Sequence, residues 1–203
     1  ANTTGVEIVA VGYQAGYSNT TGINNTAVGW SAAKAITTGT RNVALGYAAL
    51  DADTIGSKST ALGYSALGVQ NFTSATDSFN VAVGHEVGAA VTTGLKNTFI
   101  GALAGDSCTD GDHNTILGFN SDLDAAGTSQ VIVLGSQVTS QSANNFTFGF
   151  GATDSNIAFG ATSITAPSDE RYKENITTST AGLSFVKDLR PVTFQWKKEK
   201  DVP

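Results

Sequence analysis

Possible metal ligands gather around His113, where five aspartates fall within a short stretch of sequence. Carboxylate oxygens are the ligands that hard cations such as calcium prefer. The spacing fits neither an EF-hand loop nor the glycine-rich calcium repeat, and aspartates in turns commonly hydrogen-bond to nearby backbone. We therefore expect turn residues here, with no bound metal and no cofactor. The five are Asp106, Asp110, Asp112, Asp122 and Asp124.

Aromatic side chains recur at regular spacing and could bind sugar rings by stacking if they formed an exposed column. The alternative is a packing ladder, in which neighbouring rings stabilise one another by about 0.5–1.5 kcal/mol beyond burial. We favour the packing ladder, and we interpret His85 as a packing residue rather than a metal ligand. The column comprises Tyr13, Trp30, Tyr47, Tyr64, His85 and Phe119.

Residues 1–166 show no spaced Ser/His/Asp set, nucleophile elbow or phosphate-binding loop, although two carboxylates facing a sugar cleft could come together between chains. Cys108 is the only cysteine, so no disulfide forms within one chain, and we interpret it as a small apolar filler. The net charge of -6 and the lack of a basic cluster argue against nucleic-acid binding. No apolar run approaches the ~18 residues of a membrane span, so membrane insertion is not expected.

The elements that position these residues come from one repeat, seen most plainly at residues 42–47, Asn-Val-Ala-Leu-Gly-Tyr. Its glycine recurs every 17 residues, except for one step of 21. A unit this short must stack on its neighbours to bury its apolar face. We therefore predict an all-β protein with a parallel β-solenoid, or β-roll, over residues 1–138. The glycines are Gly12, Gly29, Gly46, Gly63, Gly84, Gly101, Gly118 and Gly135.

Side chains alternate with period two in each repeat, so that Val43 and Leu45 share one face while Ala44 and Gly46 share the other. We expect the bulky face to fill the interior of a narrow coil and the thin face to allow close approach of other backbone. Eight coils spaced by about 4.8 Å would make a rod on the order of 40 Å long. Because one such coil has little apolar cross-section, we expect three chains to pack side by side as a homotrimer.

Residues 6–138 resemble the head repeats of trimeric autotransporter adhesins, in which short Asn-x-x-Ala-x-Gly units form a left-handed parallel β-roll, and the similar repeats of phage tail fibres.

After Gly135 the repeat spacing shortens and phenylalanines accumulate. We interpret residues 139–167 as the intertwined strands of a triple-stranded β stem. The phenylalanines are Phe146, Phe148, Phe150 and Phe159.

The junction at residues 166–176 reads Ala-Pro-Ser-Asp-Glu-Arg-Tyr-Lys-Glu-Asn-Ile. It matches every position of Ser-Asp-x-Arg-x-Lys-x-Asn-Ile, the hallmark of the intramolecular chaperone of phage tail spikes and fibres, endosialidases and the myelin regulatory factor family. A short amphipathic helix that ends at Pro191 and an alternating strand are predicted to follow. Residues 168–203 thus resemble the N-terminal, α+β part of that chaperone.

This resemblance implies that the segment trimerises, templates folding of the stem and is released by cutting its own chain. It implies Ser168 as the nucleophile, Lys173 as the general base, and the bond between Pro167 and Ser168 as the cleavage site. A serine hydroxyl needs an adjacent base, and lysine can serve when burial lowers its pKa. The alternative is that Ser168 caps a helix whose first turn carries two acidic residues.

These patterns predict a structural and adhesive segment of a bacteriophage tail fibre or appendage, made in the host cytoplasm and carried on the virion. The expected partners are two further copies, other virion tail proteins and a bacterial surface receptor, either a glycan or a protein. Nucleic acid and membrane are not expected partners. Two alternatives are the head of a trimeric bacterial surface adhesin and the non-catalytic stem of a polysaccharide depolymerase tail spike. Self-cleavage is the only enzymatic activity expected.

Overall fold

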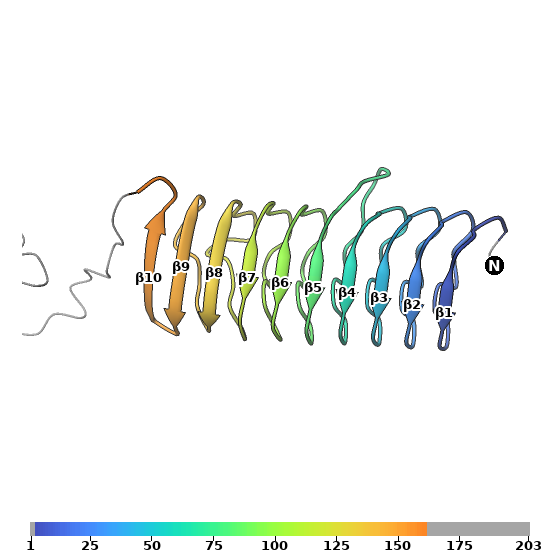
Figure 1. Cartoon of the computed structure of the whole chain (residues 1–203), viewed down its shortest axis with the longest axis horizontal. Coiled ribbons are helices and arrows are strands. Elements are labelled where there is room, and N and C mark those ends of the chain that lie inside the picture. The colour runs from blue at the N-terminus through green and yellow to red at the C-terminus, as the bar shows by residue number, and fades with distance from the viewer. Residues whose placement is uncertain (1–2, 162–203) are drawn as a thin grey trace, which may run out of the picture. The chain divides into compact units, whose positions relative to one another are not determined.

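The computed structural model describes residues 3–161, in which every regular element is a β-strand. Figure 1 shows the strands side by side, in sequence order. Seven short strands are followed by three longer ones. The strands are β1 (Val9–Val11), β2 (Thr26–Val28), β3 (Val43–Leu45), β4 (Thr60–Leu62), β5 (Val81–Val83), β6 (Thr98–Ile100), β7 (Thr115–Leu117), β8 (Val131–Ser136), β9 (Asn145–Phe150) and β10 (Thr153–Ala158).

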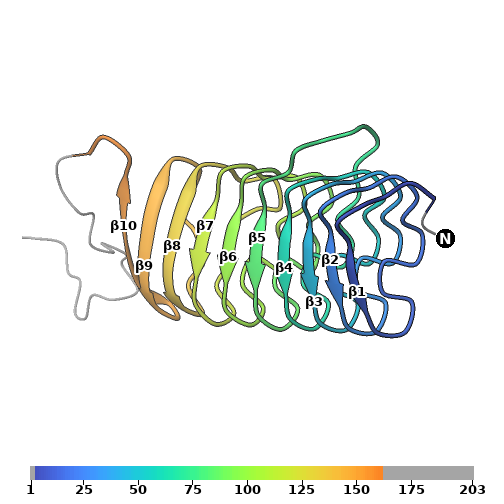
Figure 2. The ribbon, with the colours of Figure 1, turned by 45° about the vertical axis from the view of Figure 1, so that its right-hand side comes forward.

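Strands β1 to β9 pair in parallel with their sequence neighbours, which confirms the predicted parallel solenoid. Ala27 pairs with Ala44, and Ala44 with Ala61, so equivalent residues of successive repeats stand in columns. After each strand the chain runs around a coil and re-enters the sheet beside the strand it left (Figure 2). One 17-residue repeat is therefore one coil.

The prediction of which face lies inside the coil was wrong. Val43 and Leu45 are 36% and 45% exposed, whereas Ala44 between them is fully buried. Ala27 and Ala61, at the same place in neighbouring strands, are also buried. The bulky face therefore lies outside the coil, and the thin face lines its interior.

The interior has room only for small residues under these strands because the returning segment of each coil fills the rest. Leu50 and Leu67 belong to that segment and are buried in the same core as the strand alanines. In β6 the inward residue is Phe99, and the returning segments carry Gly88 and Gly105 where the two preceding coils carry Leu50 and Leu67. A Cβ on Gly105 would lie 2.8 Å from the Phe99 ring. The large residue changes sides of the coil, and the interior stays filled to the usual density.

The glycine after each strand lies against the same glycine of the next coil. Gly46 has a φ of +140°, a conformation that side chains rarely adopt, and an added Cβ would overlap the carbonyl oxygen of Gly63. The expected close approach of backbone at the thin face is therefore confirmed at the glycine. The short distance between neighbouring coils therefore requires glycine at this position of the repeat.

A column of buried asparagines runs inside the coils, one residue before the strands. Asn42 donates from Nδ2 to the carbonyl oxygen of Gly56 (2.9 Å), and its Oδ1 accepts from the backbone N–H of Ser59 (2.9 Å). Each such asparagine ties its own coil to the next, and it avoids the ~1–3 kcal/mol cost of each unpaired buried polar group. The column comprises Asn25, Asn42, Asn80, Asn97 and Asn114.

The longer coil interrupts this column, because Ser59 takes the place of asparagine. Here Gln70 donates to Oδ2 of Asp53 and to Oγ of Ser59, both at 2.8 Å, and its Oε1 accepts from Nδ2 of Asn80 at 2.8 Å. Asp53 is fully buried. Burial raises the pKa of its carboxyl group, an effect that hydrogen bonds from Gln70 and the Gly56 backbone oppose. The extra residues of this coil project as a loop between β4 and β5 (Figure 1).

Strands β9 and β10 continue the same sheet within one chain. β9 pairs in parallel with β8, and β10 turns back to pair antiparallel with β9. The rings of Phe146 and Phe148 lie 5.0 Å apart, while Phe150 and Phe159 are exposed. The intertwined three-chain stem at residues 139–167 stays a prediction, and its last residues lie outside the described range.

Candidate functional site

The outer face of the sheet is an apolar surface that one chain leaves uncovered. The first and third residues of the short strands are exposed or half-buried, and the rows continue onto β8, where Leu134 is 49% exposed. Monomeric soluble proteins rarely expose apolar patches larger than a few hundred Å². Among residues 3–161 no helix is long and apolar enough to cross a membrane. We call this surface the outer face; its most exposed members are Val9, Val11, Val43, Leu45, Ile100, Ile132 and Leu134.

The aromatic residues after the repeat glycines stack on one another from Tyr13 to His85, as predicted, whereas Phe119 lies beyond Ala102 and stands apart from this stack. The ring centroids of Trp30 and Tyr47 lie 4.7 Å apart, those of Tyr47 and Tyr64 5.0 Å apart, and those of Tyr64 and His85 4.9 Å apart. Neighbouring rings cover the faces of the inner members, so the column presents ring edges and hydroxyl groups to its surroundings. Sugar rings cannot stack on faces that are already covered.

The aspartates around His113 serve the turns. Asp112 Oδ1 accepts a hydrogen bond from the backbone N–H of Leu95 (2.7 Å), and Asp124 Oδ1 accepts one from the hydroxyl of Thr128 (2.8 Å). No three acidic, histidine or cysteine side chains come together within residues 3–161 as a metal site would require. These contacts join neighbouring coils and turns, in line with the structural interpretation of the aspartates.

Cys108 is placed as an inert interior residue. It is fully buried, and its thiol donates to the carbonyl oxygen of Gly111 at 3.7 Å. Burial is the main cause that raises the pKa of the Cys108 thiol to about 12, and the negative charges of Asp122 and Asp110 add to it. Because the thiolate is the reactive form, this thiol is unreactive at neutral pH.

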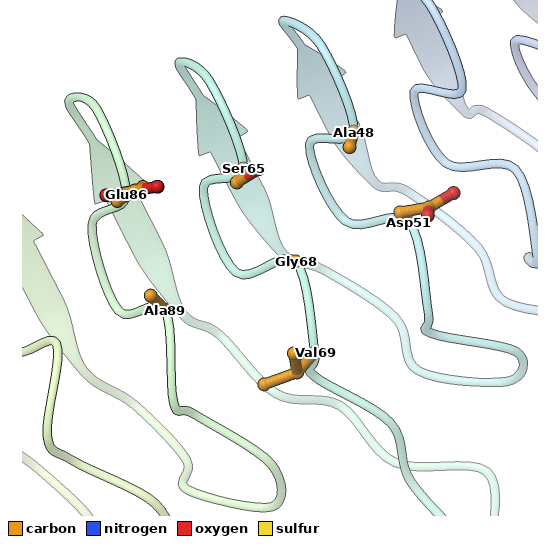
Figure 3. A pocket seen from close by; sticks show the side chains of 7 residues that line it. All are labelled: Ala48, Asp51, Ser65, Gly68, Val69, Glu86 and Ala89. Carbon is orange, nitrogen blue, oxygen red and sulfur yellow. The ribbon is translucent and has the colours of Figure 1, made fainter.

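A pocket of about 250 Å³ lies beside the longer coil (Figure 3). Burial raises the pKa of the Asp51 carboxyl group, which the charge of Lys34 opposes, and Asp51 Oδ1 is buried with no hydrogen-bond partner among residues 3–161. Asp51 and Glu86 come from coils that are two spacings, about 10 Å, apart along the sheet. The two carboxylates at this pocket are therefore not close neighbours, and we assign no chemistry to it. Its lining residues are Ala48, Asp51, Ser65, Gly68, Val69, Glu86 and Ala89.

The predicted catalytic residues Ser168 and Lys173, together with Pro167 at the predicted cleavage site, lie outside the described residues. Their roles stay predictions. The surface that sequence interpretation missed is the outer face, because that interpretation placed its residues inside the coil. The signal that could have located it is the pair Leu50 and Leu67, which require small partners in the strands.

Comparison with known protein families finds a match in the C-terminal segment. Residues 168–202 match the family model described as the chaperone of endosialidase. The chain divides into two compact units at the start of this match, Ala1–Pro167 and Ser168–Pro203. No curated protein and no solved structure matches the chain.

Proposed function

We propose that this chain is a structural and adhesive segment of a bacteriophage tail fibre or related appendage, in which three copies assemble with the help of the C-terminal chaperone segment. The match of residues 168–202 to the chaperone of endosialidase supports a phage tail protein with an intramolecular chaperone. The solenoid supports a structural role, because stacked coils make an extended body in which each coil contacts only its neighbours.

The outer face is the observation that carries the assembly proposal. The row of third strand residues is apolar from Val11 of β1 to Leu134 of β8, and the row of first residues mixes valine and isoleucine with threonine. A monomer would leave both rows in water over the whole series of coils. A half-exposed valine or leucine gains about 1 kcal/mol when it becomes fully buried. Three outer faces turned toward a common axis would cover one another at every coil, and a closed ring of identical chains needs no additional partner.

Light scattering of the native protein tests the assembly. One chain has a mass of 20.7 kDa, and the proposal requires three times that value. Leu45→Glu places a charge in the centre of the outer face and should shift the protein toward single chains. Ala75→Glu, in the exposed projecting loop, is the matched control and should remain trimeric. A native mass of one chain for the unaltered protein would reject the proposal.

Self-cleavage is the second part of the proposal. Ser168 attacks the carbonyl carbon of Pro167, Lys173 accepts the hydroxyl proton, and the proton passes to the leaving amine of residue 168, so that water later releases the acyl group. The two side chains come together only in the assembled chaperone, which makes cutting a checkpoint on assembly. The mature rod then ends at Pro167.

Mass spectrometry of the purified precursor decides this point. Ser168→Ala and Lys173→Ala should each leave the chain uncut, because removing one member of a coupled pair costs nearly as much as removing both. The cutting rate should be independent of protein concentration once trimers exist. Cleavage that persists in Ser168→Ala, or a new N-terminus at another residue, would disprove the assignment.

Host attachment is the remaining part of the proposal. A glycan, a lipopolysaccharide and a protein are all compatible receptors. Labelled trimer should bind to susceptible bacteria and not to resistant derivatives, and pretreating the cells with protease or with periodate distinguishes a protein receptor from a glycan. Equal retention on both kinds of cell would argue for a role in the fibre without receptor contact.

A further inference from the structure

Two columns of side chains border the outer face, one on each side of the strands. The aromatic column follows each strand by two residues. The other, which we call the leading column, precedes each of the short strands β1 to β7 by two residues, and all its members have a positive φ that turns the chain into the strand. The leading column comprises Glu7, Asn24, Arg41, Lys58, Phe79, Lys96 and His113, and the same seven coils place Tyr13, Trp30, Tyr47, Tyr64, His85, Ala102 and Phe119 in the other column.

The leading column holds one acidic residue, Glu7, and three of the four lysines and arginines of an otherwise acidic rod. Residues 1–167 contain four lysines and arginines, and all except Lys34 lie in this column. Lys58 is held in place there, since its Nζ lies 2.6 Å from Asp77 Oδ2 and 4.9 Å from the centre of the Phe79 ring. Three of the four cationic side chains of residues 1–167 thus share one position of the repeat.

The two columns complement each other coil by coil. Arg41 shares a coil with Tyr47, and Lys58 shares one with Tyr64, so a donor cation accompanies a tyrosine hydroxyl. In the next coil the aromatic hydrocarbon ring, Phe79, lies in the leading column, and the ring with nitrogen atoms, His85, lies in the aromatic column.

The same complementarity returns further along the rod. His113 and Phe119 again set an imidazole, with its ring N–H donor, opposite a phenyl ring, and Asn24 offers an amide acceptor to the indole N–H of Trp30. The coil of Lys96 is the exception, since Ala102 replaces the aromatic residue.

Within one chain these partners do not meet. Six residues separate the two members of each pair, and the strand between them holds them up to about 20 Å apart. Their complementarity therefore has a physical use only between chains.

We propose that the leading column of one copy packs against the aromatic column of the next copy around a threefold axis. This rests on the proposed trimer. Rotation about an axis parallel to the rod moves no residue along it, so every coil meets the same coil of its neighbour, and each pair forms at all three corners. The inner aromatic rings present edges and hydroxyls, so Arg41 and Lys58 donate to the tyrosine oxygens rather than lying over ring faces. The outer faces then fill the centre of the trimer.

Cysteine cross-linking tests the pairing. In a Cys108→Ala background, Lys58→Cys with Tyr64→Cys should give covalent trimers when a short bis-maleimide is added, because each chain links to the next around the ring. Either cysteine alone should give none. Lys58→Cys with Trp30→Cys is the matched control, because it offsets the partners by two coils and should cross-link at least tenfold less. Arg41→Cys with Tyr47→Cys repeats the test one coil away if the first pair fails to fold.

The outcomes separate this inference from the proposed function. A native mass of three chains without cross-linking of either pair, or with equal cross-linking of the offset pair, overturns the pairing and leaves the trimer standing. A native mass of one chain overturns both. Charge removal gives an independent readout: Arg41→Gln should lower the melting temperature of the trimer, whereas Lys34→Gln, outside the column, should change it less.

Discussion

The inside and the outside of the coil differ in how completely one chain buries their apolar side chains and pairs their polar groups. Inside, alanines, leucines and the asparagine column fill the space and pair their polar groups within the chain. Outside, valines, leucines and aromatic rings remain exposed on the sheet. The coil is therefore self-sufficient in its core and incomplete at its surface. Substitutions inside should therefore damage the coil itself, and substitutions outside should damage assembly.

The largest effect should come from the glycine contact between coils. Gly46→Ala puts a Cβ where the Gly63 carbonyl oxygen lies, at a φ of +140°. We expect a loss of more than about 4 kcal/mol of unfolding free energy, or no folded protein. Gly151→Ala is the control, because its φ is also positive, at +57°, but nothing lies within 4 Å of the added atom. It should cost only about 1–2 kcal/mol in urea unfolding.

Two phenylalanines compare the inside with the outside directly. Phe99→Ala empties the space between Gly88 and Gly105 and should cost about 3–5 kcal/mol at every protein concentration. Phe119, 52% exposed in one chain, contributes to assembly in our proposal. Phe119→Ala should shift the thermal midpoint by an amount that depends on protein concentration. If both variants behave alike, the division into self-sufficient core and assembly surface is wrong.

The asparagine column should give the next largest effect. Asn42→Ala leaves the Gly56 carbonyl and the Ser59 N–H unpaired inside the coil, which we expect to cost about 2–4 kcal/mol. Asn71, exposed in the longer coil, is the control, and Asn71→Ala should stay within about 0.5 kcal/mol. Denaturant midpoints of the two variants decide the matter, and similar losses would contradict a special role for the buried column.

The smallest effect concerns pH. The raised pKa of Asp53 means that the folded chain holds its proton more tightly than the unfolded chain does. The free energy of unfolding should therefore fall as pH rises from about the ordinary value of 3.8 through the folded pKa, and should stay lower above it. Asp53→Asn removes this contribution, whereas other groups titrate alike in both proteins. Urea unfolding at several pH values should show that the free energy of unfolding of the wild type minus that of the variant decreases as pH rises. A difference that stays constant with pH would contradict this role of Asp53.

The sequence was sufficient to predict the period, the strands and the parallel stack. Each coil needs a glycine where its backbone contacts the next coil, and these glycines recur at a regular spacing in the sequence. The sequence was insufficient to predict whether Val43 and Leu45 lie inside or outside the coil. Period-two alternation separates two faces without saying which is enclosed, and the answer depends on the bulk that Leu50 brings from the returning segment. The roles of Ser168 and Lys173 depend on family resemblance, since no distance between them is described.

The hydrogen bonds that join one coil to the next also determine how the rod would respond to a pulling force. A chain held at its two ends would lose its outermost coil first, because inner coils are bonded on both sides, as Asn42 is to Asn25 and Ser59. Each rupture would release 17 residues, about 60 Å of extended backbone. The coil of 21 residues would give one longer step, and its position in the force record would show from which end the rod had come apart.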